Sequence, residues 1–233
     1  MNFNINFIKY DQLYVICFDI VKVVQLAIKR KERTLYKNII DPFSAIFETS
    51  LFNSSLLTWL SLEKNRQIQK TLQNKIGLFH QKILGSVSGW HNICHNGLID
   101  LINKEKNIIA EVKNKFNTTK GNHKINIYDD LNILLKSKYI GYTAYYVTIL
   151  AKKRINKVFI PSDNRKKRKR PHNEFIREVD GKTFYNIVTG EKDAIYKIYK
   201  IIPYILSDIL KNNCKKNLLD PLFEKLFMKA FNV

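Results

Sequence analysis

Two short apolar segments carry polar residues of the types that metal-assisted chemistry requires. They are Gly97-Leu-Ile-Asp100-Leu-Ile-Asn103 and Ile108-Ile-Ala-Glu111-Val-Lys113, and a polar turn at residues 104–107 separates them. Apolar arms around a polar turn predict a β-hairpin. Asp100 lies in the middle of the first arm, where a carboxylate is costly unless it is paired or binds a metal. The hairpin is therefore a candidate metal site.

The second arm of this hairpin places an acid and a base side by side. Side chains alternate between the two faces of a strand, so Glu111 and Lys113 project from one face and Val112 from the other. Magnesium prefers oxygen ligands and typically uses one or two carboxylates, which Asp100 and Glu111 would supply, with the backbone carbonyl of Val112 as a further ligand. Lys113 would orient a water molecule or stabilise charge in the transition state. Phosphodiester hydrolysis requires such a set.

The same loose pattern occurs a second time, at Asp163 and Asp180-Gly181-Lys182. Here Asp180-Gly181 is a hairpin-turn signal between apolar segments at residues 175–179 and 183–188, so the side chains around it need not converge. The first copy has apolar strands on both arms, and we prefer it. The alternative for the first copy is a surface hairpin that carries a Glu–Lys pair.

Helical and extended patterns share the rest of the chain, which has no internal repeat. Apolar spacing and capping residues predict helices at residues 12–30, 42–49, 61–84, 129–138, 191–210 and 221–231. Aromatic and β-branched runs predict strands at residues 142–150 and 157–160, besides the two hairpins. Asp41-Pro42 and Asp220-Pro221 mark two of the helix starts, and Pro203 is expected to kink a third helix. The predicted fold is α/β or α+β, with a small mixed sheet flanked by helices.

The composition favours a cytoplasmic protein with a substantial core, since 45% of its 233 residues are hydrophobic. The most apolar N-terminal run, residues 14–28, is too short and too polar to span a bilayer, and no signal peptide is evident. Three scattered cysteines fit a reducing compartment. His91, Cys94 and His95 invite a zinc interpretation, but no second Cys/His pair follows at metal spacing, which favours a loop or a packing cluster.

The charge of the chain points to a polyanionic partner. Forty Lys and Arg residues face 20 Asp and Glu residues, for a formal net charge of +20, and such a surplus favours nucleic acid. The alternative is codon bias, because the chain is dense in Lys, Asn and Ile. The most concentrated stretch is a run of six cations between strand signals, which we predict to be a DNA-contacting loop. Its members are Arg165, Lys166, Lys167, Arg168, Lys169 and Arg170.

Longer stretches around the hairpin resemble a known family. Asp100, Glu111 and Lys113 match the PD-(D/E)XK nuclease signature, with Ile99 where the signature has proline. The stretches that precede and follow the hairpin are similar to those of SinI-like type II restriction endonucleases, over about residues 40 to 210. They are Glu63-Lys-Asn-Arg66-Gln67, Gln73-Asn74-Lys-Ile-Gly77-Leu-Phe79-His80-Gln81, Leu84-Gly85, Gly89-Trp90, Glu111-Val-Lys-Asn-Lys-Phe116-Asn-Thr and Asp180-Gly-Lys-Thr-Phe184-Tyr185.

The resemblance implies a PD-(D/E)XK restriction-endonuclease-like core in a homodimer that uses Mg²⁺ to cut double-stranded DNA. Members of the group read GG-N-CC or GG-W-CC sites and usually work beside a DNA methyltransferase that protects the host. In related nucleases an acid from the helix before the hairpin supports the metal site, which makes Glu63 a candidate here. The alternative for Glu63 is a first-turn glutamate that complements the helix dipole.

The preferred hypothesis is one nuclease domain over residues 1–233 that leaves 5′-phosphates. Within it we expect an N-terminal helical part at residues 1–50, a catalytic core at 57–160, a basic loop and hairpin at 161–190, and C-terminal helices at 191–233. Two alternatives remain. One is the same fold in a repair or structure-selective nuclease, and the other is a non-catalytic basic DNA-binding protein.

Overall fold

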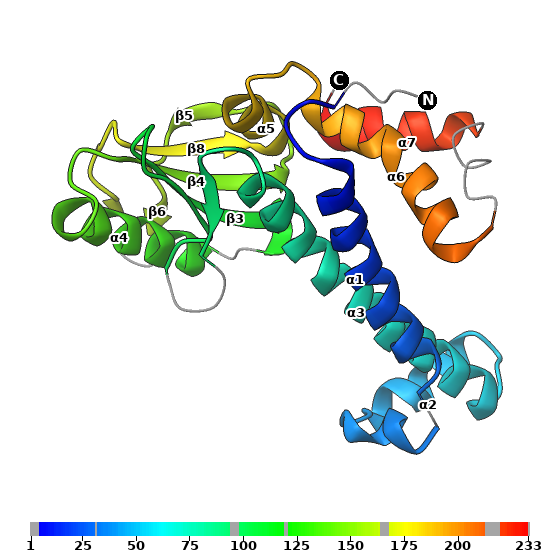
Figure 1. Ribbon diagram of the computed structural model, residues 1–233. Coiled ribbons are helices and arrows are strands. Elements are labelled where there is room, and N and C mark those ends of the chain that lie inside the picture. Colours follow the sequence, from blue (N-terminus) through cyan, green and yellow to red (C-terminus); the bar gives the residue numbers. More distant parts are fainter. Residues whose placement is uncertain are drawn as a thin grey trace. The chain divides into compact units, whose positions relative to one another are not determined.

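A computed structural model describes residues 5–30, 32–93, 98–118, 121–163, 168–212 and 220–232 (Figure 1). The chain divides into two compact units. One consists of Met1–Cys17 and Gly77–Val233, and the other of Phe18–Ile76. Helices α1 (Tyr10–Ile28) and α3 (Leu56–Gly85) contribute residues to both units.

The first unit is built on a mixed sheet. Its strands are β1 (Trp90–Asn92), β2 (Leu101–Asn103), β3 (Ile108–Lys115), β4 (Thr143–Leu150), β5 (Asn156–Val158) and β8 (Ile176–Asp180). The strand order is β1-β2-β3-β4-β8-β5, in which β1, β2 and β3 are antiparallel, β3, β4 and β8 are parallel, and β5 runs antiparallel to β8. The predicted hairpin of residues 98–113 is confirmed as β2 and β3, and the predicted strand of residues 142–150 as β4.

Helix α4 (Gly121–Ser137) covers one face of this sheet (Figure 1). Its apolar side chains occur every three or four residues and pack on apolar residues of β3, β4 and β8. The cluster contains Ile127, Tyr128, Leu131, Leu135, Ile109, Ala144, Tyr146 and Ile176. The helix begins eight residues before the predicted start at residue 129, because Ile125, Ile127 and Tyr128 are spaced too closely to show a helical period.

Helix α5 (Gly181–Thr189) packs on the other face, where Phe184 contacts the rings of Trp90 and Tyr145. The predicted hairpin turn at Asp180-Gly181 is therefore wrong. Asp180 is the N-cap of the helix, and its carboxylate accepts a hydrogen bond from the Thr183 N–H at 3.0 Å. An aspartate followed by glycine serves equally well in a turn and at a helix start, so the local signal was ambiguous.

The C-terminal part of the first unit is helical, as predicted. Helix α6 (Ala194–Leu210) holds Pro203 within it, and its buried residues include Ile195, Ile198 and Ile205. Helix α7 (Pro221–Phe231) starts at the predicted Asp220 cap. Phe227 of α7 packs against two tyrosine rings of α6, so α7 is held on α6 by aromatic contacts.

A short ribbon of β6 (Ser162–Asp163) and β7 (Arg168–Lys169) occupies the segment that we predicted as a continuous basic loop. The predicted strand at residues 157–160 corresponds in part to β5. A short 3₁₀ helix, η2 (Phe116–Thr118), follows β3. None of these short elements changes the order of the main sheet.

The second unit contains the later part of α1, η1 (Glu32–Lys37), α2 (Pro42–Leu51) and the earlier part of α3. The predicted start of α2 is confirmed, since the Asp41 carboxylate accepts a hydrogen bond from the Phe43 N–H at 2.9 Å. Glu48 of α2 accepts hydrogen bonds from Trp59 and Arg66 of α3.

With a mixed sheet in the first unit and helices in both units, the fold is mixed α/β, as predicted. No helix of the described residues is long and apolar enough to cross a membrane.

Candidate active site

The hairpin fixes the position of Asp100 beside the second strand. Leu101 pairs with Ala110 in the antiparallel ladder, and the backbone N–H of Asp100 donates to the Ala110 carbonyl at 2.9 Å. Asn107 adopts a left-handed conformation with φ of 52° and completes the turn. Asp100 lies directly before β2 rather than in mid-strand, which corrects the sequence-based placement. The backbone of Asp100 is bonded on both sides, because its carbonyl also accepts a hydrogen bond from the Ile93 N–H at 2.9 Å.

The Asp100 carboxylate is tied to β3. Its Oδ2 atom accepts a hydrogen bond from the backbone N–H of Val112 at 2.7 Å. Val112 follows Glu111, so this bond brings the two predicted acids close together. Burial of Glu111 and the nearby charge of Asp100 raise the pKa of Glu111 from 4.5 to about 7, despite the opposing effect of Lys113. The two carboxylates repel each other, and a bound cation would relieve this repulsion.

Lys113 forms an ion pair with Glu111. The side chain of Lys113 is 28% exposed and that of Glu111 is 12% exposed, so solvent screens this pair only in part. Burial opposes the charged form of Lys113, but the bond to Glu111 and the charges of Glu111 and Asp100 raise its pKa overall. The three residues that the sequence predicted as a site are thus brought together.

The donor set fits a hard cation. Two carboxylates and the carbonyl of Val112 are oxygen ligands of the kind that magnesium prefers, and no group of three or more His, Cys, Asp and Glu side chains suited to a metal occurs among the described residues. The Val112 carbonyl accepts a long hydrogen bond of 3.4 Å from the side chain of Gln81 on α3. Sequence reasoning gave Gln81 no role, although it lies in a stretch that resembles the restriction enzymes.

Cross-strand pairing extends the site over one face of the sheet. Glu111 pairs with Tyr146 of β4, Tyr146 with Glu178 of β8, and Glu178 with Lys157 of β5. Paired residues of neighbouring strands project from the same face, and this is the face that α4 covers. Lys124 of α4 lies 3.6 Å from the Glu178 carboxylate and 5.6 Å from the centre of the Tyr146 ring.

A hollow of about 450 Å³ lies at the Glu178–Lys157 end of this series of paired residues. Three lysines and one glutamate line it, together with apolar residues of the segment after β5. The charged members are Lys124, Lys157, Lys169 and Glu178. The surplus of positive charge makes this a place that an anion would favour.

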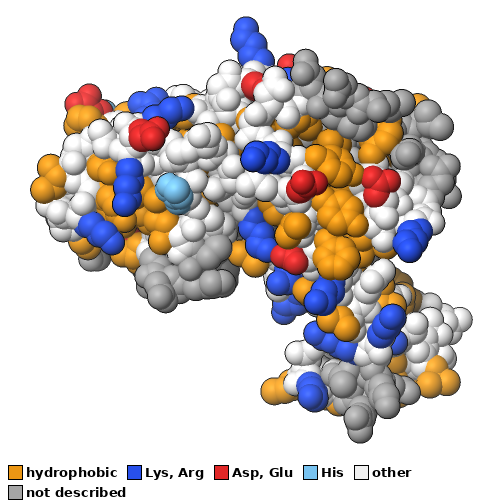
Figure 2. Space-filling view, in the orientation of Figure 1, with side chains coloured by type: hydrophobic (Ala, Val, Ile, Leu, Met, Phe, Trp, Pro, Cys, Tyr) orange, Lys and Arg blue, Asp and Glu red, His pale blue; other side chains and the backbone are white. Residues whose placement is uncertain are grey.

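The predicted basic loop falls only partly within the described residues. Arg165, Lys166 and Lys167 lie outside them, as does the side chain of Arg168, whose backbone forms part of β7. Lys169 is exposed and lines the hollow. Arg170 makes two hydrogen bonds, of 2.8 and 2.6 Å, to the carboxylate of Asp129 on α4. Figure 2 shows Lys and Arg side chains spread across the visible face among hydrophobic ones.

The second copy of the acid-x-lysine pattern has a structural role. The Asp180 carboxylate accepts hydrogen bonds from Thr183 and from the N–H of Ile155, and pairs with Arg154 at 3.0 Å. Lys182 pairs with Asp193 at 3.0 Å rather than with Asp180. The side chain of Asp163 lies outside the described set. Every oxygen of Asp180 is thus engaged in capping α5 and the segment before β5.

Glu63 belongs to the second unit, where it lies on α3. Its carboxylate accepts hydrogen bonds from Arg66 at 2.8 Å and from Gln67 at 3.0 Å. Burial opposes ionisation of Glu63, but the bonds from Gln67 and Arg66 lower its pKa overall. Glu63 is therefore an ionised carboxylate, and its part in a metal site stays a prediction.

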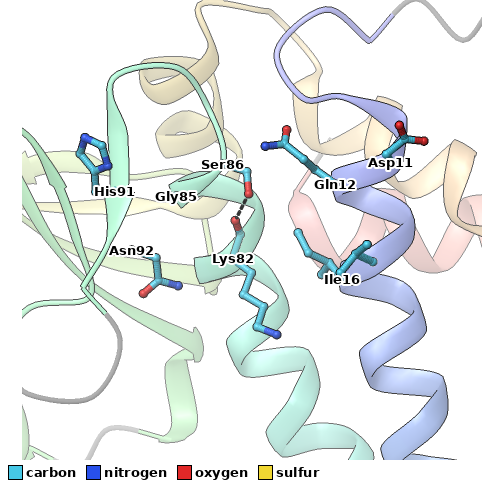
Figure 3. Close-up of a pocket in the computed structure, with 9 residues that line it drawn as sticks. Asp11, Gln12, Ile16, Lys82, Gly85, Ser86, His91 and Asn92 are labelled. Atoms are coloured by element: carbon cyan, nitrogen blue, oxygen red, sulfur yellow. Dashed lines mark hydrogen bonds between the residues drawn. The ribbon is translucent and has the colours of Figure 1, made fainter.

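A second hollow, of about 650 Å³, lies between the start of α1, the end of α3 and β1 (Figure 3). Asp11, Gln12, Lys82 and His91 are among its lining residues, and Ser86 donates to the Lys82 carbonyl within it. His91 belongs to the group of Cys and His residues that the sequence analysis considered as a zinc site. The other two members, Cys94 and His95, lie outside the described residues. The hollow is lined by mixed charges and does not extend the carboxylate site.

Comparison with known proteins decides the class to which this site belongs. The chain matches the family described as Eco47II restriction endonuclease over residues 5–211. It is 43% identical over 184 residues to the type II restriction enzyme Eco47II of Escherichia coli, an alignment that covers 77% of either chain. The chain belongs to the Eco47II restriction endonuclease family. It is also 33% identical over 202 residues to the type II restriction enzyme Sau96I of Staphylococcus aureus, covering 84% of this chain and 77% of that relative.

Membership of the Eco47II family confirms the resemblance to type II restriction endonucleases. The protein is a type II restriction enzyme, a hydrolase that binds DNA and cuts it as an endonuclease. The alternatives of a repair nuclease and of a non-catalytic DNA-binding protein are set aside. The matched stretch contains the hairpin, β4, β8 and α5, so the Eco47II family match spans every element of the candidate site.

Proposed function

We propose that this Eco47II-family enzyme has a PD-(D/E)XK core and cuts double-stranded DNA with Mg²⁺ at Asp100 and Glu111. The observation that carries the proposal is the 2.7 Å bond from the Val112 N–H to the Asp100 carboxylate, which gathers both acids next to Lys113. The carbonyl of Val112 would be a third ligand, and Glu63 a further one, directly or through water. The oxygen-only donor set supports magnesium over softer metals.

The chemistry is hydrolysis of a phosphodiester. Bound magnesium would polarise the phosphate and lower the pKa of a water molecule. Lys113 orients the attacking water and stabilises the charge that develops on the phosphate oxygens. The bond from phosphorus to the 3′ oxygen breaks, and the products carry a 5′-phosphate and a 3′-hydroxyl. Lys113 can take this part only after it leaves Glu111, since Glu111 must offer its oxygens to the cation.

We propose that residues 165–170 contact the DNA backbone. Two observations support this role. Lys169 lines a hollow with Lys124 and Lys157, and the strand pairing sets that hollow on the same face of the sheet as Glu111. A strand of DNA that presents a phosphate to Glu111 would therefore run towards these lysines. The pair of Arg170 with Asp129 anchors the end of the loop to α4.

A homodimer that reads a GG-N-CC or GG-W-CC type of site is part of the proposal, because a two-fold dimer matches a palindromic site with one active centre per strand. A large apolar surface on the second unit supports self-association. Phe43, Phe47, Leu51 and Phe52, on α2 and at its end, are each at least 66% exposed. Exposed apolar patches of this kind mark interaction sites. We expect Phe47→Glu to sediment as a monomer. The control variant Lys37→Glu should sediment as a dimer.

We further propose that residues 1–233 work as one nuclease domain in the cytoplasm and that a DNA methyltransferase protects the host's own sites. No contact with that methyltransferase is implied. A gene for a cytosine methyltransferase beside the gene for this chain would support the pairing, and sequencing of the cut ends would give the site and the position of cleavage.

The test of the nuclease proposal is cleavage of plasmid DNA with Mg²⁺. We expect discrete fragments from the natural protein and at least about a hundredfold slower cleavage by Glu111→Gln and Lys113→Gln. Glu105→Gln is the matched control, because Glu105 is an exposed carboxylate on the turn of the same hairpin. Unchanged cleavage by both Glu111→Gln and Lys113→Gln would refute this assignment of the site.

A further inference from the structure

Tyr146 carries a polar group that the fold does not explain. Its side chain is fully buried at the centre of β4, where its ring stacks on Phe159 with centroids 4.8 Å apart. Its hydroxyl has no hydrogen-bond partner among the described residues. A buried hydroxyl without a partner is unfavourable, and phenylalanine would fill the same space without that cost.

Other buried tyrosines of this unit satisfy their hydroxyls. Tyr128, from the same apolar cluster, donates to the Pro171 carbonyl at 2.7 Å. The hydroxyl of Tyr185 lies 2.9 Å from a ring nitrogen of His80. The solitary hydroxyl of Tyr146 is therefore not a general property of this core, and its position calls for a partner in another state of the protein.

The strand register places Tyr146 beside the candidate site. Tyr146 is the pairing partner of Glu111 on β3, and Lys113 is two residues further along the same face. Diagonal neighbours at this spacing are within reach of long side chains. Burial lowers the pKa of Lys113, while Glu111, Asp100 and, to a smaller extent, Tyr146 raise it, which agrees with a phenol close to the ammonium group.

Lys113 needs a second partner if Glu111 is to bind a cation. In this structure the ammonium group of Lys113 pairs with the Glu111 carboxylate. An ammonium group has three donors and no acceptor, and Lys113 is largely buried. Once the oxygens of Glu111 turn to the cation, the ammonium group of Lys113 requires another acceptor, and a phenol oxygen can supply one.

We propose that the hydroxyl of Tyr146 accepts a hydrogen bond from Lys113 when Glu111 releases it, so that Tyr146 is a positioning residue for the catalytic lysine. This inference rests on the proposed function. It explains why a tyrosine occupies a core position that favours phenylalanine. It also gives the hydroxyl a partner in the cation-bound state, in which Lys113 needs a new acceptor.

Tyr146→Phe is the direct test, with Tyr128→Phe as the matched control from the same cluster. We expect Tyr146→Phe to melt at the same temperature as the natural protein or higher, to bind Mg²⁺ about tenfold more weakly in calorimetry, and to cleave DNA about tenfold more slowly in single turnovers. Tyr128→Phe should melt at a lower temperature, because it loses the bond to Pro171, but should keep both Mg²⁺ binding and cleavage.

A double-mutant cycle with Lys113→Gln separates positioning from a structural effect. Because Tyr146 acts through Lys113, adding Tyr146→Phe to Lys113→Gln should change neither Mg²⁺ affinity nor the remaining cleavage rate. Natural Mg²⁺ affinity and cleavage in Tyr146→Phe, beside impaired Lys113→Gln, would overturn this inference and leave the proposed function standing. Natural cleavage by Lys113→Gln itself would overturn both.

Discussion

The backbone N–H of Val112 donates to the carboxylate of Asp100 at 2.7 Å, and this one bond joins the two arms of the hairpin at the candidate site. It holds Asp100 beside Glu111 although Asp100 lies outside the regular strand. The bond uses one oxygen atom of Asp100, Oδ2, so the carboxylate is oriented as well as placed. Orientation of a metal ligand by a neighbouring hydrogen bond is a common means of tuning such sites.

We expect Asp100→Asn to separate orientation from charge. The amide oxygen of asparagine can still accept the bond from Val112, so the fold and the melting temperature should change little. The lost charge should weaken Mg²⁺ binding and slow cleavage by about a hundredfold or more. Calorimetry with Mg²⁺ and single-turnover cleavage measure the two effects. Glu105→Gln, which removes an exposed carboxylate from the turn of the same hairpin, is the control, and a similar loss in both variants would contradict a specific role for Asp100.

The pKa of Glu111 predicts how Mg²⁺ binding depends on pH. The pKa of Glu111 is raised to about 7, and a protonated carboxyl does not bind the metal. The affinity for Mg²⁺ should therefore fall as the pH decreases through 7, and should be about tenfold lower at about pH 6 than at about pH 8. Titrations at the two pH values measure the change, and a flat profile would be inconsistent with Glu111 as a ligand.

The same pKa predicts the pH dependence of stability without metal. The pKa of Glu111 is 4.5 in the unfolded chain and about 7 in the folded one, so the folded state binds more protons between these values. The free energy of unfolding should therefore fall as the pH rises from about 4.5 to about 7. Glu111→Gln cannot ionise and should lack this part of the slope. Urea denaturation with a chelator compares the two proteins.

Glu63 can be tested against a second carboxylate that binds the same arginine. Arg66 contacts both Glu63 and Glu48, so each substitution to glutamine removes one charge from the same cluster. If Glu63 supports the cation, Glu63→Gln should weaken Mg²⁺ binding about tenfold, whereas Glu48→Gln should leave it unchanged. Equal Mg²⁺ affinities for the two variants would reduce the site to two acids.

The basic loop should divide into a DNA-contacting residue and an anchoring residue. Lys169→Ala, in the slowly cleaving Glu111→Gln background, should weaken DNA binding and lower the slope of log affinity against log salt by about 1. Arg170→Ala should instead lower the melting temperature, as should Asp129→Asn, because each breaks the pair between the loop and α4. Gel-shift titrations at several salt concentrations and thermal melts distinguish these roles.

Gly181 tests the helix start that replaced the predicted hairpin. A Cβ atom at this position would lie 2.5 Å from the Ile149 carbonyl oxygen, whereas one at Gly77 of α3 would have nothing within 4 Å. We expect Gly181→Ala to destabilise the protein by about 1–3 kcal/mol and Gly77→Ala to stabilise it by up to about 1 kcal/mol. A stabilised Gly181→Ala would show that the contact between α5 and β4 is less tight than described.

Features that depend on neighbours along the chain could be predicted from the sequence. Strand alternation set Glu111 and Lys113 on one face, and Asp41 and Asp220 capped their helices as predicted. Family motifs around the hairpin identified the class of enzyme. Local patterns suffice here because alternation and capping are determined within a few residues.

Contacts between residues far apart in the sequence could not be predicted in this way. Asp180-Gly181 became a helix start because its carboxylate is held by Thr183, Ile155 and Arg154, and because the glycine packs on β4. The proximity of Tyr146 to Glu111 follows from the parallel pairing of β3 with β4, which joins residues 35 positions apart. Such contacts depend on which strands become neighbours, and the free energy of packing the whole sheet, rather than any local pattern, determines that order.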